Sequence, residues 1–158
     1  MHEIAGIPSE KVVYIDETGV DKKVYEYGWS HHSQLVTAKR SGKRCERVSI
    51  VAGLCKGALL GAYQFLGTCN TDIFVDWLTQ VLLPKLGEGF VLVMDNARFH
   101  KSQRIVELIE AAKCRLLFLP PYSPDLNPIE QRWFPLKNNI RKTLRQSENL
   151  WEAVKKEI

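Results

Sequence analysis

The sequence predicts an α/β fold, with a mixed five-stranded sheet and helices on both faces. Apolar runs at 11–17, 90–95 and 115–119 are typical of buried strands. Helical patterns lie between the later strands, and such connections favour right-handed parallel crossovers. At 158 residues, with 45% hydrophobic and 25% charged residues, the chain matches one globular domain with a real core. We therefore expect residues 1–158 to form a single domain.

The first part of the chain predicts three strands and a polar excursion. We expect residues 11–17 to form the first strand. Residues 20–45 are polar and aromatic, so we expect them to leave the core. Residues 46–54 and 57–66 predict two strands joined by a tight turn at Lys56–Gly57, which is a hairpin pattern.

Two helices are predicted among the later strands. Asn70 or Thr71 is a suitable N-cap for a helix that continues to about Leu86, where glycines follow. After the strand at 90–95, Ser102 is a suitable N-cap for the second helix. The strand at 115–119 ends at a double proline.

The last predicted helix opens in the segment SPDLNPIE. Asn127 fits the N-cap, Pro128 the first helical position and Glu130 the third, which is also a capping-box pattern. We expect this helix to reach about Gln146. Pro135 removes a backbone hydrogen bond, so it should kink the helix or delay its start, at a cost of ~3 kcal/mol if uncompensated.

The resulting order is strand, hairpin, helix, strand, helix, strand, helix. Three leading strands followed by parallel ones are the ribonuclease H-like arrangement. The sequence contains no internal repeat, low-complexity tract or linker that would indicate a second domain.

Three carboxylates occupy special positions in this fold. Asp16 and Asp95 each end an apolar run, and Glu130 lies where the last helix opens. Strand ends and a helix packed near them meet at one rim of the sheet, where three carboxylates need cations between them. Such hard oxygen ligands favour Mg²⁺ or Mn²⁺. The pattern predicts a two-metal phosphoryl-transfer site.

Each carboxylate also has an ordinary explanation. An Asp at a strand end is commonly a turn former, and Asp95 before Asn96 suits an Asx turn. Glu130 is explained by helix capping. The occurrence of all three in the required elements and order favours the catalytic interpretation.

Two neighbouring side chains are interpreted differently. Glu17 follows Asp16 on a strand and should point to the opposite face, so we do not count it as a ligand. For His100, a structural role at a helix start is favoured over contact with a scissile phosphate or a metal-bound water.

The last helix carries basic residues without acidic ones between Gln131 and Gln146. On a helical wheel, three of them fall within about 60° of Glu130. This single-sign row indicates contact with a phosphate backbone, although a solvated helix face is the usual meaning of a basic run. The candidate DNA-binding residues in this helix are Lys137, Arg141, Lys142 and Arg145.

A second basic cluster lies in or beside the excursion. Residues of this kind would position a duplex without reading its sequence. The alternative is a set of surface side chains without a partner. The candidate DNA-binding residues here are Lys39, Arg40, Lys43 and Arg44.

Several function classes are not supported by the sequence. Motifs for nucleotide phosphates and for the serine-hydrolase elbow are missing, and the four cysteines have no zinc or disulfide spacing. No stretch reaches the ~18 apolar residues of a membrane helix, and no signal peptide is visible. We expect a cytoplasmic protein without membrane contact, associated with the nucleoid if its source is prokaryotic.

Three segments carry a resemblance to a known family: YIDETG, VLVMDNARFHKS and FLPPYSPDLNPIEQRWFPLK. In addition, thirty-four residues separate Asp95 from Glu130. From about Val12 to Arg145, the chain resembles the catalytic domain of mariner-superfamily insertion-sequence transposases. These enzymes carry a DDE triad on a ribonuclease H-like, integrase-like fold.

The resemblance implies that Asp16, Asp95 and Glu130 form the metal-binding catalytic triad, with two Mg²⁺ or Mn²⁺ ions. It implies cleavage of DNA at transposon ends and attack of the freed 3′-hydroxyl on target DNA, usually at a TA step. A homodimer on paired ends is also implied, with residues 20–45 contacting the other subunit.

Relatives carry an N-terminal helix-turn-helix region, which we expect to be absent here. Either the sequence is a truncated form, or the DNA-binding half is made separately or joined by frameshifting. Two alternatives remain open. One is a ribonuclease H-like nuclease without strand transfer, and the other is an inactive DNA-binding remnant.

Overall fold

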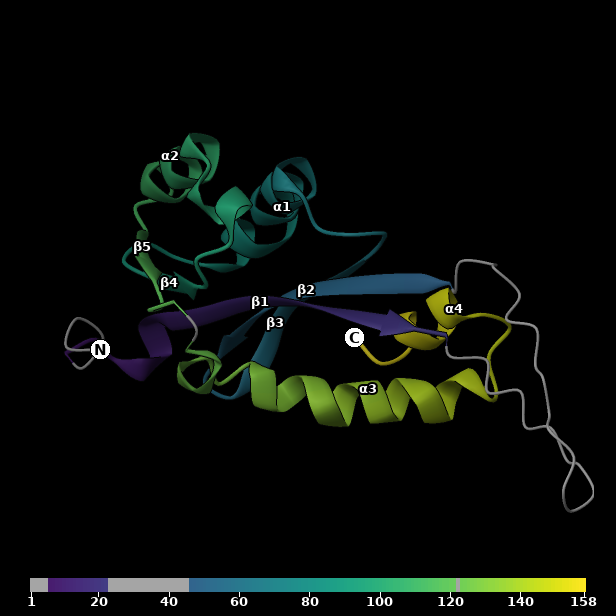
Figure 1. Cartoon of the computed structure of the whole chain (residues 1–158). Coiled ribbons are helices and arrows are strands. Elements are labelled where there is room, and N and C mark those ends of the chain that lie inside the picture. Colours follow the sequence, from purple (N-terminus) through teal and green to yellow (C-terminus); the bar gives the residue numbers. More distant parts are fainter. Residues whose placement is uncertain (1–5, 23–45, 122) are drawn as a thin grey trace, which may run out of the picture.

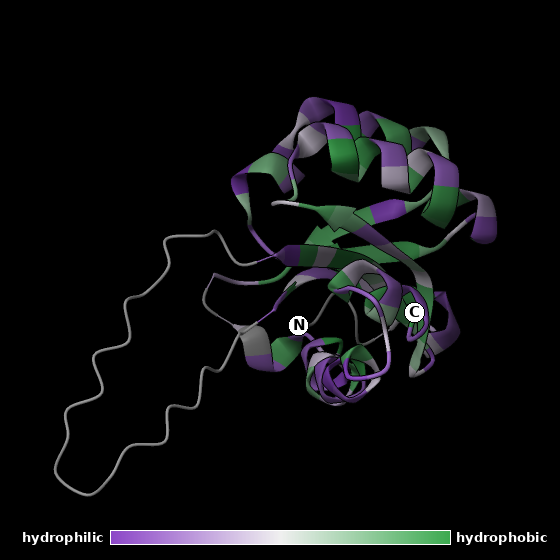
Figure 2. Cartoon of the chain, turned by 90° about the vertical axis from the view of Figure 1, so that its right-hand side faces the viewer, coloured by the Kyte–Doolittle hydropathy of each residue, from purple (hydrophilic) through white to green (hydrophobic). Residues whose placement is uncertain are grey.

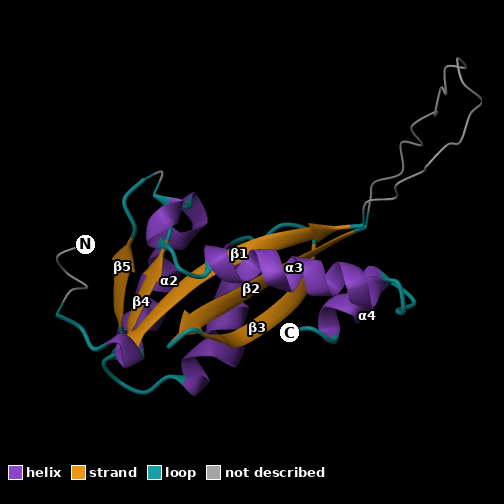
Figure 3. Ribbon diagram, turned by 90° about the horizontal axis from the view of Figure 1, so that it is seen from below, coloured by secondary structure: helices purple, strands orange, loops and turns teal. Residues whose placement is uncertain are grey.

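The computed structural model describes residues 6–22, 46–121 and 123–158. Its sheet has the strand order β3-β2-β1-β4-β5 (Figure 3). The β1–β2 and β2–β3 pairs are antiparallel, whereas β1–β4 and β4–β5 are parallel. The predicted mixed five-stranded sheet is therefore confirmed. The strands are β1 (Val12–Asp21), β2 (Arg47–Cys55), β3 (Ala58–Leu66), β4 (Val91–Met94) and β5 (Arg115–Phe118).

Helices cover both faces of this sheet, as predicted. α1 and α2 lie on one face, and α3 and α4 lie on the other (Figure 1). The first face contains the larger buried cluster, and the second is closed mainly by α3. The helices are α1 (Thr71–Trp77), α2 (Gln103–Ala111), α3 (Glu130–Leu144) and α4 (Leu150–Lys155).

The alternation of side chains along β1 determines which face each residue serves. Val13 and Ile15 are fully buried against α1 and α2. Val12 and Tyr14 pack in clusters on the other face. Because successive strand side chains point to opposite faces, Asp16 projects on the α3 face.

The α3 face is closed by an apolar stripe. Trp133, Leu136 and Ile140 of α3 pack on β2, which is buried on both faces over most of its length. Figure 2 shows the strands as mainly hydrophobic, between helices that carry both hydrophobic and hydrophilic segments. This packing fixes the start of α3 against the sheet, beside the end of β4.

The predicted helix at 71–86 is shorter than expected. The Asn70 side chain accepts a hydrogen bond from the Ile73 N–H, so the predicted N-cap is confirmed. The α-helix ends at Trp77 and continues as a π-helical turn (Leu78–Leu82) and a 3₁₀ turn (Leu83–Lys85). Pro84 lies in this last turn, and its missing N–H prevents a regular helical hydrogen bond there.

The second predicted helix starts where expected but without the predicted cap. α2 begins directly after Ser102, yet the Ser102 side chain makes no capping hydrogen bond. Instead, a 3₁₀ turn at Arg98–Lys101 leads the chain into the helix. The Ser102 carbonyl accepts from the N–H groups of Ile105 and Val106.

The predicted start of the last helix is wrong by two residues. α3 begins at Glu130, and among the described residues no capping hydrogen bond forms from the Asn127 side chain. Asn127 is buried in a turn, and its carbonyl oxygen accepts from the Glu130 N–H at 3.1 Å. The capping explanation of Glu130 therefore loses its hydrogen-bond basis.

Pro135 does not interrupt α3, which is one continuous helix of 15 residues. Pro135 and Gln131 are both exposed. The hydrogen bond that Pro135 removes would have been accepted by the Gln131 carbonyl, where water can take its place. Because the unpaired carbonyl faces solvent, Pro135 does not break the helix as expected.

The helix α4 has no counterpart among the elements predicted from the sequence. Asn149 caps this short helix, because its side chain accepts from the Glu152 N–H at 2.9 Å. Leu150, Ala153 and Val154 are fully buried against the α3 face of the sheet. Within the described ranges, none of the helices has the length and apolarity needed to span a bilayer.

Candidate active site

The candidate site lies where β1 and β4 separate. These strands pair in parallel over residues 12–14 and 91–93. β4 ends one residue before Asp95, whereas β1 continues beside β2. If the register is extended by two residues, Asp16 and Asp95 stand opposite each other. Asp16 and Asp95 both line the opening that forms there.

The position of Asp16 differs from the prediction in one respect. β1 extends to Asp21, so Asp16 lies within the strand rather than at its end. Asp16 instead marks the point at which β1 loses β4 as its neighbour. The missing strand leaves space on that side of β1, and the carboxylate emerges into it.

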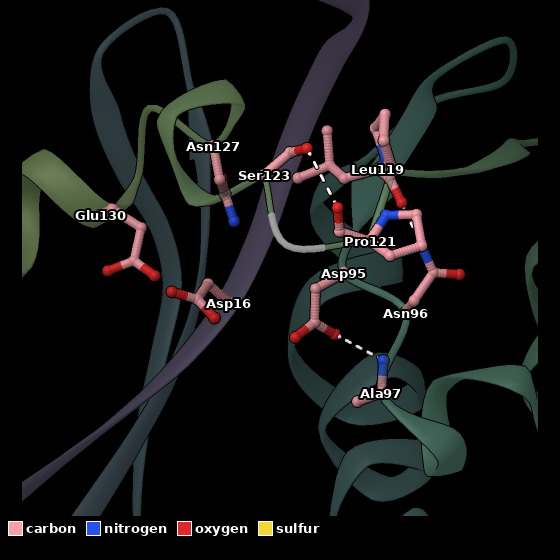
Figure 4. Close-up of a pocket in the computed structure, with 10 residues that line it drawn as sticks. Asp16, Asp95, Asn96, Ala97, Leu119, Pro121, Ser123, Asn127 and Glu130 are labelled. Carbon is pink, nitrogen blue, oxygen red and sulfur yellow. Dashed lines mark hydrogen bonds between the residues drawn. The ribbon is translucent and has the colours of Figure 1, made fainter.

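Glu130 provides the third carboxylate as the first residue of α3. Figure 4 shows the Asp16 and Glu130 carboxylates directed toward each other, with Asp95 on the other side of Asp16. The structure thus brings all three predicted residues to one pocket of about 380 Å³. Its lining residues are Asp16, Asp95, Asn96, Ala97, Leu119, Pro120, Pro121, Ser123, Asn127 and Glu130.

The Asp16 carboxylate sits in an unfavourable environment for a negative charge. Burial raises its pKa to about 7, and nearby Glu130 and Glu17 add to the increase. The indole N–H of Trp133 donates to Asp16 Oδ2 at 2.7 Å, which lowers the pKa but does not compensate for burial. Asp16 therefore has a strong tendency to bind a positive charge.

The Asp95 carboxylate, in contrast, lies in an environment that stabilises its negative charge. Its Oδ1 accepts from the Ala97 N–H at 2.9 Å, which is the Asx turn that the sequence suggested. The same oxygen also contacts Nδ1 of His100 at 2.7 Å. The His100 hydrogen bond is the main reason that the pKa of Asp95 lies below its usual range. Asp95 is therefore ionised and oriented at neutral pH.

The donor atoms fit divalent cations of the Mg²⁺ type. One oxygen of Asp16 is occupied by Trp133 and one of Asp95 by His100 and Ala97. Among the described residues, no side chain donates a hydrogen bond to the second oxygen of either carboxylate. Asn127 also lines the pocket, and its buried side-chain oxygen lacks a hydrogen-bond partner among the described residues. These are hard oxygen donors.

The described residues contain no group of three His, Cys, Asp or Glu side chains that could hold a metal ion. Mg²⁺ commonly uses one or two carboxylates and takes its other ligands from water and substrate phosphates. Ligation by all three carboxylates at once is therefore not required, and the donor set remains compatible with such ions.

His100 has the structural position that the sequence favoured. Its side chain is fully buried, with Nδ1 against Asp95 and Nε2 at 2.8 Å from Glu17 Oε1. Burial alone would lower its pKa, but the hydrogen bonds to Asp95 and Glu17 outweigh this effect and raise the pKa to about 9. Glu17 lies on the face opposite Asp16, as predicted.

Two of these contacts were not predicted from the sequence. The Trp133–Asp16 hydrogen bond spans 117 residues, and the His100–Glu17 contact spans 83. The available signals were a polar ring nitrogen on each of two aromatic residues near the motifs. Neither signal specifies which carboxylate the ring will meet.

The candidate DNA-binding residues of α3 are accessible. Arg141, Lys142 and Arg145 are exposed, and Lys137 is half-buried. Within the described part of the chain, none of the four forms an ion pair. Their role in binding DNA stays a prediction. The second predicted cluster lies outside the described residues: Lys39, Arg40, Lys43 and Arg44.

Comparison with known sequences identifies relatives of this domain. The sequence profile described as "DDE superfamily endonuclease" matches residues 11–156. The Tc1 transposase of Caenorhabditis elegans is 33% identical over 91 residues, which are 52% of this chain and 33% of that protein. A 39 kDa protein of insertion element IS630 from Shigella sonnei is 28% identical over 140 residues, covering 87% of this chain and 36% of that protein. The chain thus spans about a third of these curated relatives.

Comparison of structures supports the fold. The Mos1 strand transfer complex matches with a TM-score of 0.65 and 18% sequence identity, covering 94% of this chain and 45% of the matched chain. At this level of identity the likeness establishes the architecture alone, and it confirms the predicted ribonuclease H-like fold. The match to residues 11–156 covers almost the whole chain and confirms the resemblance drawn from the three motifs. The chain therefore belongs to the DDE superfamily endonucleases.

Proposed function

We propose that this chain is the catalytic part of a DNA transposase. It would cleave DNA at transposon ends and join the freed 3′-hydroxyl to target DNA. Asp16, Asp95 and Glu130 would bind two Mg²⁺ or Mn²⁺ ions. The observation that carries the proposal is the meeting of these three carboxylates, from β1, the end of β4 and the start of α3, around one pocket.

The three residues have different roles in this proposal. Asp16 lies between the other two carboxylates and is best placed to be shared by both ions (Figure 4). Asp95 and Glu130 would each hold one ion. When bound, such ions activate an oxygen nucleophile and stabilise the leaving oxygen. The protein itself orients the carboxylates through Trp133 and His100.

The proposed partner is DNA, both as transposon ends and as target. Lys137 and Arg141 share one flank of α3 with Glu130, so a phosphate backbone lying along that flank would pass the pocket. We further propose a homodimer on DNA and a helix-turn-helix half, separate or fused by frameshifting, that supplies recognition of the ends. The reaction would then take place in the cytoplasm, at the nucleoid if the cell is prokaryotic.

Metal-dependent nicking of supercoiled plasmid tests the catalytic assignment. We expect the wild-type chain to nick DNA with Mn²⁺ or Mg²⁺, and Asp95→Asn to lose this activity. Asp125→Asn is a matched control, because Asp125 is exposed and does not line the pocket. Equal nicking by wild type and Asp95→Asn would exclude the proposed site. DNA binding without any nicking would support the inactive remnant.

A second assay separates a transposase from a simple nuclease. The substrate is an oligonucleotide duplex with a pre-cut 3′-hydroxyl end, mixed with plasmid. A transposase joins the oligonucleotide to the plasmid, and a labelled oligonucleotide reports the product directly. Plasmid nicking without joined product would support a nuclease that only hydrolyses.

A further inference from the structure

A buried histidine connects β1, which carries Asp16, with Asp95, which directly follows β4. The His100 side chain is 0% exposed and lies between carboxylates from different elements. Its Nδ1 is 2.7 Å from Asp95 Oδ1, and its Nε2 is 2.8 Å from Glu17 Oε1. An ionised carboxylate accepts hydrogen bonds but cannot donate them, so this arrangement uses both ring nitrogens as donors.

The contact with His100 restricts the Asp95 carboxylate. Asp95 Oδ1 receives the His100 ring and the Ala97 N–H together, so Oδ2 is the oxygen left for a ligand in the pocket. Rotation of the carboxylate would break both hydrogen bonds and leave a buried ring nitrogen unpaired. The side chain is 54% exposed, and solvent alone would leave it free to change rotamer. His100 therefore holds the Asp95 carboxylate in one orientation, although the side chain is exposed to solvent.

The ring of His100 is itself fixed. It packs against Phe74 of α1 and against Phe99, with ring centroids 4.7 and 4.2 Å away. Glu17, whose side chain is only 17% exposed, holds Nε2 from β1. Since Glu17 directly follows Asp16, the contact also ties the Asp95 side chain to the strand that carries Asp16.

We propose that His100 and Glu17 are positioning residues that hold Asp95 in the orientation needed to bind a divalent metal ion. Neither residue lines the pocket, so they act on Asp95 rather than on DNA. This inference rests on the proposed function of the pocket. It extends the site to the opposite face of the sheet, where His100 packs against Phe74 of α1.

Two substitutions of similar polarity test the hydrogen bonds of the two His100 ring nitrogens one at a time. In His100→Asn the side-chain amide reaches the place of Nδ1 and still donates to Asp95. In His100→Gln the amide reaches the place of Nε2, so contact with Glu17 remains and donation to Asp95 is lost. Each variant loses one hydrogen bond, so a purely structural role predicts similar defects in both.

The readout is Mn²⁺ binding to the metal-free chain, measured by isothermal titration calorimetry, with Asp95→Asn identifying the heat from the pocket. We expect His100→Gln to weaken Mn²⁺ binding by about 10–100-fold, the range found when partners of metal ligands are removed. His100→Asn should remain within a few-fold of wild type. Gel-shift binding of DNA without metal should be unchanged in both variants.

Glu17→Gln provides a second variant in case both His100 substitutions unfold the chain. It keeps the size of the side chain but replaces the charged partner of Nε2 by a neutral amide, which weakens the hydrogen bond that fixes the ring from β1. We expect weaker Mn²⁺ binding with circular dichroism like that of wild type. Unchanged Mn²⁺ binding in His100→Gln or in folded Glu17→Gln, or equal losses in the two His100 variants, would overturn the positioning role.

Failure of the proposed function would look different. Wild type would then neither bind Mn²⁺ in a manner sensitive to Asp95→Asn nor nick DNA, and both inferences would fall together. Wild-type binding and nicking, with His100→Gln unaffected, would overturn the positioning role alone and leave the catalytic assignment in place.

Discussion

At the scale of a single residue, the buried Asp16 carboxylate lowers the stability of the fold when it is ionised. Its carboxylate is half-buried and faces Glu130, and its pKa is raised to about 7 mainly by burial. Between about pH 4 and 7 the folded chain therefore retains a proton that the unfolded chain releases. Stability from this group is present at low pH and is lost as the pH rises through the folded pKa.

We therefore expect Asp16→Asn to be more stable than wild type in metal-free buffer at pH 8. The amide has no charge to bury, and its oxygen can still accept from Trp133. The gain should be on the order of 1–2 kcal/mol after allowance for solvent screening, and it should shrink toward pH 5. Urea denaturation at the two pH values measures it.

The control for this prediction is Asp125→Asn, whose side chain is exposed. That variant should differ from wild type by less than about 0.5 kcal/mol at both pH values. If Asp16→Asn is less stable than wild type at pH 8, the ionised Asp16 carboxylate does not destabilise the folded chain.

At the scale of the element, α3 combines two tasks on different sides. Trp133, Leu136 and Ile140 bind it to the sheet, while Glu130 and the basic residues face outward. Its continuation through Pro135 keeps these positions in helical register, so Lys137 and Arg141 lie near Glu130 on the wheel. The helix thus gives any bound phosphate backbone a fixed relation to the pocket.

The double variant Lys137→Ala/Arg141→Ala should bind DNA less tightly and with a weaker salt dependence. Each lost phosphate contact lowers the slope of log K against log salt by about 0.9, so we expect a decrease of about two units. Fluorescence anisotropy over a range of salt concentrations measures the slope. Lys155→Ala/Lys156→Ala removes the same charge from exposed positions at the end of the chain and should leave the slope nearly unchanged.

At the scale of the whole molecule, both faces of the sheet must be closed for the site to form. α1 and α2 bury one face, and α3 with α4 buries the other. The pocket opens at the edge of the α3 face, so its geometry depends on how firmly that face is packed. The short helix α4 contributes three fully buried side chains to this packing.

Leu150→Ala should therefore destabilise the chain by about 2–5 kcal/mol, the usual cost of removing a fully buried leucine side chain. Lys155→Ala in the same helix should cost less than about 0.5 kcal/mol. Urea denaturation, with the slope m compared between variants, measures both. A loss below about 1 kcal/mol in Leu150→Ala would mean that α4 is not part of the cooperative core.

The strands and the spacing of the carboxylates could be predicted because their signals are local. Apolar runs identify β1, β4 and β5, and the intervening helical patterns require parallel crossovers between them. Helix starts were less predictable. Asn127 has the right side chain for a cap, but its burial in the turn before α3 takes it out of reach.

The sequence by itself determined that three carboxylates would come from two parallel neighbours and a following helix, since strand pattern and connection hand fix that arrangement. Only the tertiary structure decided how each carboxylate is held. The Asp16–Trp133 and Glu17–His100 contacts join residues 117 and 83 positions apart. Their partners are selected by packing across the sheet, and packing between distant segments has no local pattern in the chain.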